Sequence, residues 1–284
     1  MELQEKRETI YKNVSLALEE DLGHGDLTSL LIDEGTDASA TIISRSDCTL
    51  CGSAWAAETF HQLNPNTEIK WTARDGDVLN QNSTICQIKG NARTILTGER
   101  TALNFLQALS GIATKTRSYV KAVSHTRAEI LDTRKTLPGL RLASKYAVQT
   151  GGGVNHRIGL FDGVLIKENH IMAAGGTEQA LAEAFSVSED KLVQIEVESI
   201  DQMEIAIEAG AKLILLDNFS LEQTTAAVIK NKGRAKLEAS GGIDLESVVK
   251  IAETGVDRIS IGTLTKDIKA VDLSLRIQLI GNTR

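Results

Sequence analysis

The spacing of hydrophobic positions becomes regular after residue 125. From there on, short apolar runs alternate with stretches in which apolar residues recur every three or four positions. The first pattern is typical of buried strands and the second of amphipathic helices. Because strands that alternate with helices return to the same end of a sheet, this order predicts a parallel sheet. The predicted strands are residues 128–132, 163–167, 191–198, 212–217, 235–239 and 257–262.

The type of parallel sheet follows from the spacing of the strands. The last four predicted strands recur about every twenty to twenty-five residues, the length of one βα unit. No GxGxxG motif follows any strand, which argues against a dinucleotide-binding Rossmann domain. We therefore predict an α/β protein in which residues 126–265 form a closed or nearly closed parallel β/α barrel of about six or seven strands.

The pattern before residue 125 is mixed. Residues 8–32 read as a helix that ends at a glycine turn, and residues 39–54 and 67–90 as short strands joined by turns. Residues 97–123 have apolar positions at helical spacing around much of the circumference, which predicts a long helix packed on several sides. These features predict an N-terminal α+β domain over residues 1–125, and we expect the tail 266–284 to pack on it.

Composition and charge narrow the function classes. Hydrophobic residues make up 42% of the 284 residues and charged residues 24%, which is typical of a globular protein. The formal net charge of −7 argues against a general nucleic-acid binder, which normally has a basic surface. The N-terminus is polar, and no apolar run approaches the length of a membrane span. We therefore expect a cytoplasmic protein with no nucleic-acid or membrane partner.

Every predicted strand after residue 125 ends in a polar or glycine-containing group. In β/α barrels the catalytic groups lie where the strands end. A single such group is most simply a solvated strand end, but the same feature at all six strands predicts a functional site. The groups are Arg134 and Lys135, Lys167, Glu196 and Glu198, Asp217, Ser240 with Gly241 and Gly242, and Gly262.

Several cations are predicted to meet at this edge. Three glycines at 151–153 stop a helix and are followed by His156 and Arg157 on a loop. With the pair Arg134 and Lys135, these residues indicate a pocket for a multiply charged anion. Guanidinium groups bind carboxylates and phosphates through paired hydrogen bonds, whereas an ammonium group acts as a mobile point charge.

A phosphate site and a metal site are predicted beside these cations. The glycine-bearing loops "EASGGI" and "ISIGT" follow the last two strands, where barrels commonly bind phosphate. Glu196 and Asp217 end successive strands, and such carboxylates suit Mg²⁺ that shares a phosphate with a substrate. A salt bridge with Lys167 is the alternative role, and the two roles can coexist. Together these groups indicate transfer at a phosphorylated sugar.

Long motifs then give the chain a family resemblance. In order they are "EDLGHGDLTS", "GERTALNFLQALSGIAT", "LDTRKTLPGLR", "KYAVQTGGGVNHRIGLFD", "IKENHI", "EVES", "LLDN", "EASGGI" and "ISIGTLTK". Over nearly its full length the chain resembles the quinolinate phosphoribosyltransferase family. The resemblance implies a sandwich-like N-terminal domain, an incomplete barrel, a requirement for Mg²⁺ and a homodimer. It also implies that quinolinate and 5-phosphoribosyl-1-pyrophosphate give nicotinate mononucleotide, pyrophosphate and CO₂.

The same resemblance implies a role for each matched residue. Lys135, Lys167, Glu196 and Asp217 would be catalytic, and the two carboxylates would hold the metal. Arg100 would reach the site of the other subunit in the dimer. Quinolinate would be bound by Arg100, Arg134, Lys135, His156, Arg157 and Lys167. The phosphoribosyl pyrophosphate would be bound by Lys135, Glu196, Asp217, Ser240, Gly241, Gly242, Gly262 and Lys266.

Three other functions remain open at this point. A related phosphoribosyltransferase could act on a different acid, which its preference for one carboxylate or two would reveal. A Schiff-base aldolase could use Lys167, which ends a strand inside an apolar run, and borohydride would then trap its carbonyl substrate. A non-catalytic module could simply bind anions, in which case pyridine acids would bind without turnover.

Overall fold

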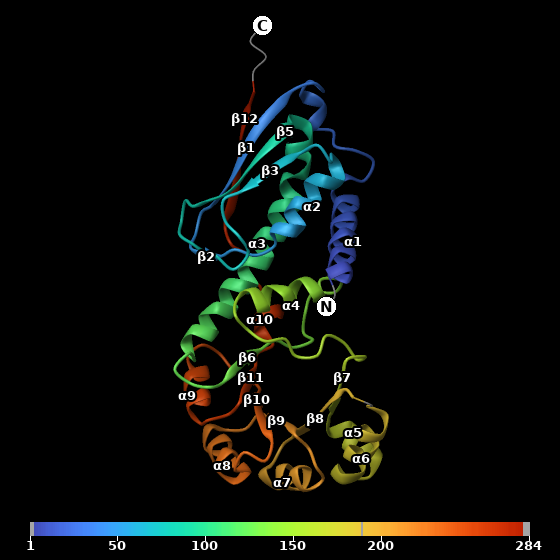
Figure 1. The fold of residues 1–284 in the computed structure, drawn as a ribbon, viewed down its shortest axis with the longest axis vertical. Helices are drawn as coiled ribbons and strands as arrows, with labels where there is room; N and C mark the ends of the chain where they lie inside the picture. The colour runs from blue at the N-terminus through green and yellow to red at the C-terminus, as the bar shows by residue number, and fades with distance from the viewer. Residues whose placement is uncertain (1–2, 189, 281–284) are drawn as a thin grey trace. The chain divides into compact units, whose positions relative to one another are not determined.

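The computed structural model describes residues 3–188 and 190–280, and the chain forms two compact units (Figure 1). The first contains the residues up to 115, residues 137–151 and those from 267 on, and the second contains 116–136 and 152–266. This division differs from the boundary predicted at residue 125, whereas the tail predicted from residue 266 does belong to the first unit from residue 267 on. The continuous helix α3 (Ala92–Ala122) contributes to both units, so the boundary falls within a helix.

A second difference concerns helix α4 (Arg141–Thr150), which was predicted in the barrel domain but belongs to the first unit. Its Tyr146 explains the difference. The Tyr146 hydroxyl donates a 2.9 Å hydrogen bond to Asp75, and its ring lies 5.6 Å from that of Trp55. The helix is therefore held by side chains from the N-terminal part of the chain.

The first unit is built on an antiparallel sheet in the order β12-β1-β5-β3. Its C-terminal strand β12 pairs with β1 along seven residue pairs, so the tail up to residue 280 lies on this sheet, while residues 281–284 of the predicted tail lie outside the described residues. A two-stranded ladder of β2 and β4 completes the strands. The strands are β1 (Asp37–Ser44), β2 (Cys48–Thr49), β3 (Glu68–Trp71), β4 (Val78–Leu79), β5 (Thr84–Asn91) and β12 (Leu273–Leu279).

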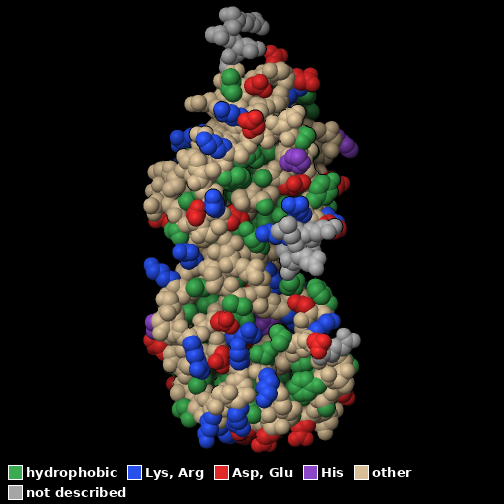
Figure 2. All heavy atoms as spheres, in the orientation of Figure 1, with side chains coloured by type: hydrophobic (Ala, Val, Ile, Leu, Met, Phe, Trp, Pro, Cys, Tyr) green, Lys and Arg blue, Asp and Glu red, His purple; other side chains and the backbone are tan. Residues whose placement is uncertain are grey.

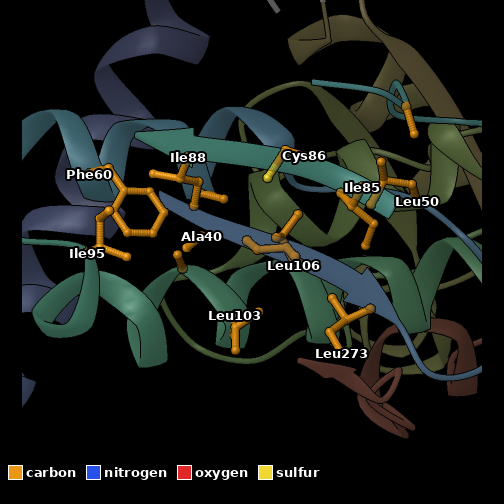
Figure 3. Close-up of a cluster of buried hydrophobic side chains, with 14 of the residues drawn as sticks. Ala40, Leu50, Phe60, Ile85, Cys86, Ile88, Ile95, Leu103, Leu106 and Leu273 are labelled. Atoms are coloured by element: carbon orange, nitrogen blue, oxygen red, sulfur yellow. The ribbon is translucent and has the colours of Figure 1, made fainter. Parts of the chain in front are cut away.

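One hydrophobic cluster joins this sheet to the helices. Ile42 of β1, Ile88 of β5 and Leu106 of α3 are fully buried in it, and Figure 3 shows side chains from these strands and this helix side by side. The alternating burial along β1 is the period of two that a sheet with one covered face requires. The remaining helical elements of this unit are α1 (Leu3–Leu22), the 3₁₀ turn η1 (Ser29–Leu31) and α2 (Ser53–Leu63).

The second unit contains a six-stranded sheet in the order β6-β11-β10-β9-β8-β7, in which every pairing is parallel. Among the described residues no ladder joins the outer strands β6 and β7, so the sheet does not close. The predicted α/β class with an incomplete barrel is confirmed. The strands are β6 (Glu129–Leu131), β7 (Gly163–Ile166), β8 (Leu192–Val197), β9 (Leu213–Asp217), β10 (Lys236–Ser240) and β11 (Arg258–Ser260).

Helices cover the outer face of this sheet (Figure 1). Ile195, Ile214 and Leu237 pack in one cluster with Met203 and Ala227 of the helices. Because successive side chains on a strand point to opposite faces, the residues between these apolar positions point to the inner face. The helices are α5 (Glu168–Ala174), α6 (Thr177–Val187), α7 (Ile200–Glu208), α8 (Leu221–Asn231), α9 (Ser247–Glu253) and α10 (Thr263–Lys266).

Charged side chains of both signs are mixed on the surface. Lys and Arg side chains are interspersed with Asp and Glu over the face shown in Figure 2, so that face has no continuous basic area.

Within residues 3–188 and 190–280, none of the helices combines the length and the apolar character needed to cross a membrane.

Candidate active site

The predicted site residues of the second unit follow the carboxyl ends of neighbouring strands. Lys167 follows β7, Glu196 lies near the end of β8, and Asp217 ends β9. The register aligns Asp217 with Ser240 at the end of β10, and Ser240 with Ser260 at the end of β11. These groups therefore lie along one edge of the sheet. The same edge receives Gly241 and Gly242 after β10, Gly262 after β11, and Arg134 and Lys135 after β6.

Lys167 and Glu196 form an ion pair across β7 and β8. The Lys167 Nζ lies 2.7 Å from Glu196 Oε2, and the two side chains are 49% and 15% exposed. A pair with this much solvent contact adds little to stability. The salt bridge considered from the sequence is therefore present, and both groups stay accessible to a substrate.

The turn after β10 is shaped by its glycines. Asn218 donates through Nδ2 to Asp217 Oδ2 at 2.9 Å, and its backbone N–H donates to the Ser240 carbonyl at 2.9 Å. Gly241 has φ +112°, and a Cβ at this position would collide with Asn218 Oδ1. The close approach of this turn to Asn218 therefore requires glycine.

Lys135 lies against the next glycine loop. A Cβ built on Gly262 would lie 3.0 Å from Lys135 Cδ and 3.8 Å from its Nζ. The backbone of Lys135 is held on both sides, because its carbonyl accepts from Thr265 Oγ1 at 2.8 Å and its N–H donates to Thr133 Oγ1 at 3.1 Å. An ammonium group thus lies beside the glycine loop, and the exposed Lys266 ends the short helix that follows.

Arg157 is a cation without a full set of partners. Its Nη1 donates to the Gly163 carbonyl at 2.8 Å, but its buried Nε has no hydrogen-bond partner. Burial lowers the pKa of Arg157, the nearby charge of Arg134 lowers it further, and Asp162 opposes both effects. An unpaired buried donor costs about 1–3 kcal/mol, and charged groups cost more. Two guanidinium groups held close together, one with an unsatisfied N–H, form a site suited to a multiply charged anion.

His156 is held by the chain at three points. Its backbone N–H donates to Asp132 Oδ1 at 2.9 Å, and its Nδ1 accepts from the Arg157 N–H at 2.8 Å. Its Nε2 lies 2.8 Å from Gln194 Oε1. An imidazole that accepts at Nδ1 and donates at Nε2 is neutral. This geometry fits a ring that carries a proton on Nε2, and the binding of quinolinate by His156 stays a prediction.

The buried polar residues behind this edge were missed by the sequence analysis. Asp132 follows β6, Gln194 lies within β8 and Glu238 within β10, and all three are buried. A signal was available, because a polar residue in the middle of an apolar strand is unusual. Gln194 and Glu238 each precede a predicted site residue by two positions, which places them on the same inner face.

Two predicted features are not assembled by the second unit itself. Arg100 is exposed on α3 and belongs to the first unit. No group of three or more His, Cys, Asp or Glu side chains among the described residues is arranged to hold a metal ion. Glu196 and Asp217 are thus two carboxylates on adjacent strands without a third protein ligand of these types.

Family models match almost the whole chain. The model described as "Quinolinate phosphoribosyl transferase, N-terminal domain" matches residues 26–110. The model for the C-terminal domain of the same family matches residues 112–276.

Individual relatives agree with these matches. The chain is 41% identical over 261 residues to a probable nicotinate-nucleotide pyrophosphorylase [carboxylating] of Bacillus subtilis (strain 168), covering 92% of this chain and 90% of the relative. It is 39% identical over 266 residues to a nicotinate-nucleotide pyrophosphorylase [carboxylating] of Mycobacterium leprae (strain TN), covering 91% and 94%. Among solved structures, the nicotinate-nucleotide pyrophosphorylase from Francisella tularensis gives a TM-score of 0.93 at 48% identity, over 96% of this chain and 97% of that one.

Proposed function

The chain belongs to the quinolinate phosphoribosyl transferase family, and from this membership and its cationic sheet edge we propose that it joins quinolinate to 5-phosphoribosyl-1-pyrophosphate. The products are nicotinate mononucleotide, pyrophosphate and CO₂, a step in NAD biosynthesis. The observation that carries the proposal is the buried, unpartnered Nε of Arg157 beside Arg134. A dicarboxylate supplies negative charge beside the two guanidinium groups and an acceptor for Arg157 Nε.

Quinolinate binds through the cations at the carboxyl edge of the parallel sheet. Arg134 and Arg157 take its two carboxylates, with Lys167 beside them and His156 holding the loop that carries Arg157. Fixed cations replace the water that the carboxylates lose, which offsets the cost of desolvation. Lys135 contacts both substrates, since it follows Arg134 in the chain and its side chain lies against the loop of Gly262.

The phosphoribosyl pyrophosphate binds along the ends of β8 to β11. Ser240, Gly241, Gly242 and Gly262 receive its phosphate through their turns, with Lys135 and Lys266 as nearby positive charges. The approach of backbone to backbone that Gly241 permits is supporting evidence, since a phosphate cradle needs turns without side chains.

Mg²⁺ is the proposed cofactor, and the two available carboxylates suit it. Mg²⁺ is commonly bound through one or two carboxylates together with substrate phosphates, so a third protein ligand is not required. Glu196 and Asp217 would hold it, at the same edge as the ribose site. When bound, it would neutralise charge on the pyrophosphate leaving group.

The chemistry needs little acid–base catalysis from the protein. The pyridine nitrogen forms a bond to the anomeric carbon as the carbon–oxygen bond to pyrophosphate breaks. Glu196 and Asp217 stabilise the positive charge that develops on the ribose. The quaternised ring then accepts the electron pair of the bond to the adjacent carboxylate as CO₂ leaves, and a solvent proton takes that position. The protein contributes orientation and electrostatics.

The proposed assembly is a homodimer with a shared site. Arg100, exposed on α3, would complete the quinolinate site of the partner subunit. Mixing Arg100→Ala with Arg157→Ala should restore part of the activity, because one of the two sites in a mixed dimer is then intact. Mixed dimers without any recovery would count against the shared site. The expected cytoplasmic location stays a prediction, which cell fractionation tests.

The deciding assay incubates the protein with Mg²⁺, 5-phosphoribosyl-1-pyrophosphate and quinolinate and follows CO₂ together with nicotinate mononucleotide. A parallel reaction contains nicotinate, which has one carboxylate fewer. Equimolar CO₂ and nucleotide from quinolinate alone is the expected result. Turnover of another pyridine acid only would favour the paralogous transferase, and trapping of a carbonyl substrate by borohydride would favour the aldolase.

A further inference from the structure

Three side chains form a buried hydrogen-bond chain behind the anion-binding edge. The ring of His156 contacts Gln194 of β8 at 2.8 Å, and Gln194 Nε2 donates to Glu238 Oε2 of β10 at 3.0 Å. Gln194 is 5% exposed and Glu238 is 1% exposed. These hydrogen bonds therefore link a loop at the carboxyl edge of the sheet to a carboxylate in the interior of the unit.

The direction of each hydrogen bond follows from the first one. Because His156 Nδ1 accepts the Arg157 N–H, the proton of the neutral ring is on Nε2 and is donated to Gln194 Oε1. The amide nitrogen of Gln194 then faces Glu238, where it finds an acceptor. The opposite amide orientation would oppose two donors at the ring and two acceptors at the carboxylate. The carboxylate thus selects the orientation of Gln194, and Gln194 favours the same tautomer of His156 as the Arg157 N–H does.

The buried carboxylate is costly for the fold. Glu238 Oε1 has no hydrogen-bond partner and lies 3.6 Å from His156 Nε2. An apolar residue would fill this interior position without the desolvation penalty. Glu238 is therefore unfavourable for folding, and it is connected to the site through Gln194. Its presence is best explained by its effect on the site.

The loop that carries His156 and Arg157 lies beside β6, an edge strand of the sheet among the described residues. Val154 forms an isolated bridge with Leu131 at the edge of β6, and Asp162 accepts from the N–H groups of Ile158 and Gly159. Between these two anchors, the ring of His156 contacts Gln194 on the inner face of the sheet, and the backbone N–H of His156 donates to Asp132. Arg157 is the next residue and is bonded to that ring through its own N–H.

We propose that Glu238, acting through Gln194, is a positioning residue that fixes the tautomer and ring orientation of His156 and thereby the placement of Arg157. The identity of the anion that Arg157 binds rests on the proposed function, whereas the tautomer does not. Neither Glu238 nor Gln194 touches the substrate in this scheme.

The first test is the tautomer of His156 in the wild-type protein. Two-bond ¹H–¹⁵N spectra of protein labelled at its five histidines separate the two neutral tautomers and the charged ring, and His156→Asn assigns the signals. We expect the Nε2–H form for His156. A wild-type ring protonated at Nδ1 would overturn the proposal before any other variant is made.

The second test removes the carboxylate. In Glu238→Leu the amide of Gln194 loses its acceptor and is free to turn, so the Nε2–H signature of His156 should weaken or disappear. Glu238→Gln retains an acceptor oxygen and should restore it. A folded Glu238→Leu protein with the wild-type His156 signature would refute the positioning role.

Steady-state kinetics give the readout on the substrate. Glu238→Leu and Gln194→Leu should each raise the KM for quinolinate by about tenfold and leave the KM for 5-phosphoribosyl-1-pyrophosphate nearly unchanged. Because both residues act through the same series of hydrogen bonds, the double variant should raise the KM for quinolinate no more than the more damaging single variant does. Equal increases in both KM values would indicate a general structural defect and contradict the proposal.

Thr224→Val is the matched control. It removes a buried hydroxyl on α8 in the same unit, which donates to the Ser220 carbonyl of its own helix, so it should change neither the tautomer nor either KM. If wild-type protein turns over no quinolinate at all, the proposed function fails, while the spectra still decide the role of Glu238.

Discussion

The two edges of the parallel sheet treat their polar groups differently. At the amino edge, the chain satisfies its own groups. The amide of Asn231 bonds both the carbonyl and the N–H of Ala235, at 2.8 and 3.1 Å. Asp257 accepts from the Leu237 N–H at 2.9 Å, and Arg127 lies 3.4 Å from the same carboxylate.

At the carboxyl edge, polar groups are left for something else to satisfy. Arg157 keeps a buried Nε without a partner, close to the charge of Arg134. Lys167 pairs with Glu196, and this pair is half exposed on the lysine side. In β/α barrels the amino edge generally serves stability and the carboxyl edge carries the site, and we expect the same division here. Variants at the two edges should separate these effects.

The largest effect is expected for Arg157→Ala. Loss of a bidentate cation for a carboxylate should lower kcat/KM by about a thousandfold or more. Thermal stability should stay the same or rise, because the variant removes an unpaired buried donor and a repulsion with Arg134. Arg127→Ala is the matched control at the amino edge, where activity should be retained. Enzyme kinetics and thermal unfolding of both variants measure the two effects. A large loss of stability in Arg157→Ala would contradict the division of the two edges into binding and stability.

A second prediction concerns Mg²⁺. Asp217→Asn keeps the size of the side chain but removes a charge, so kcat should fall by about a hundredfold and the Mg²⁺ concentration for half-maximal activity should rise. Titration of activity with Mg²⁺ measures both. The amino-edge control is Asp257→Asn, for which the Mg²⁺ requirement should match that of the wild type. An unchanged Mg²⁺ titration in Asp217→Asn would remove this residue from the metal site.

The amino edge should show the reverse behaviour. Asn231→Ala leaves the N–H and the carbonyl of Ala235 without their partner, so the free energy of unfolding should fall by about 1–3 kcal/mol. The kinetic constants of the folded protein should not change. Denaturant unfolding and assays well below the transition test the two statements separately. A loss of activity without a loss of stability would show that the edges are not divided in this way.

The sequence predicted the edge better than the interior behind it. All six strands of the parallel sheet and the helices between them follow from apolar periodicity, because each βα unit buries its own apolar face. The charged residues at the strand ends could be identified because a strand end is a local feature. Glu238 and Gln194 stand out locally only as polar residues within apolar strands, and their role depends on a contact between β8 and β10, which no local pattern records. The same limit explains α4, whose place in the first unit depends on Asp75 and Trp55, far away in sequence.

The smallest expected effect compares two exposed lysines at opposite edges. Lys266 follows β11 at the carboxyl edge, and Lys236 begins β10 at the amino edge. Lys266→Ala should raise the KM for 5-phosphoribosyl-1-pyrophosphate about three- to tenfold, and the difference from wild type should shrink as salt screens the charge. Lys236→Ala has the same change in net charge and should leave this KM unchanged at any salt concentration. Equal effects of the two variants would mean that overall charge, and not the location of the lysine at the carboxyl edge, attracts the phosphorylated substrate.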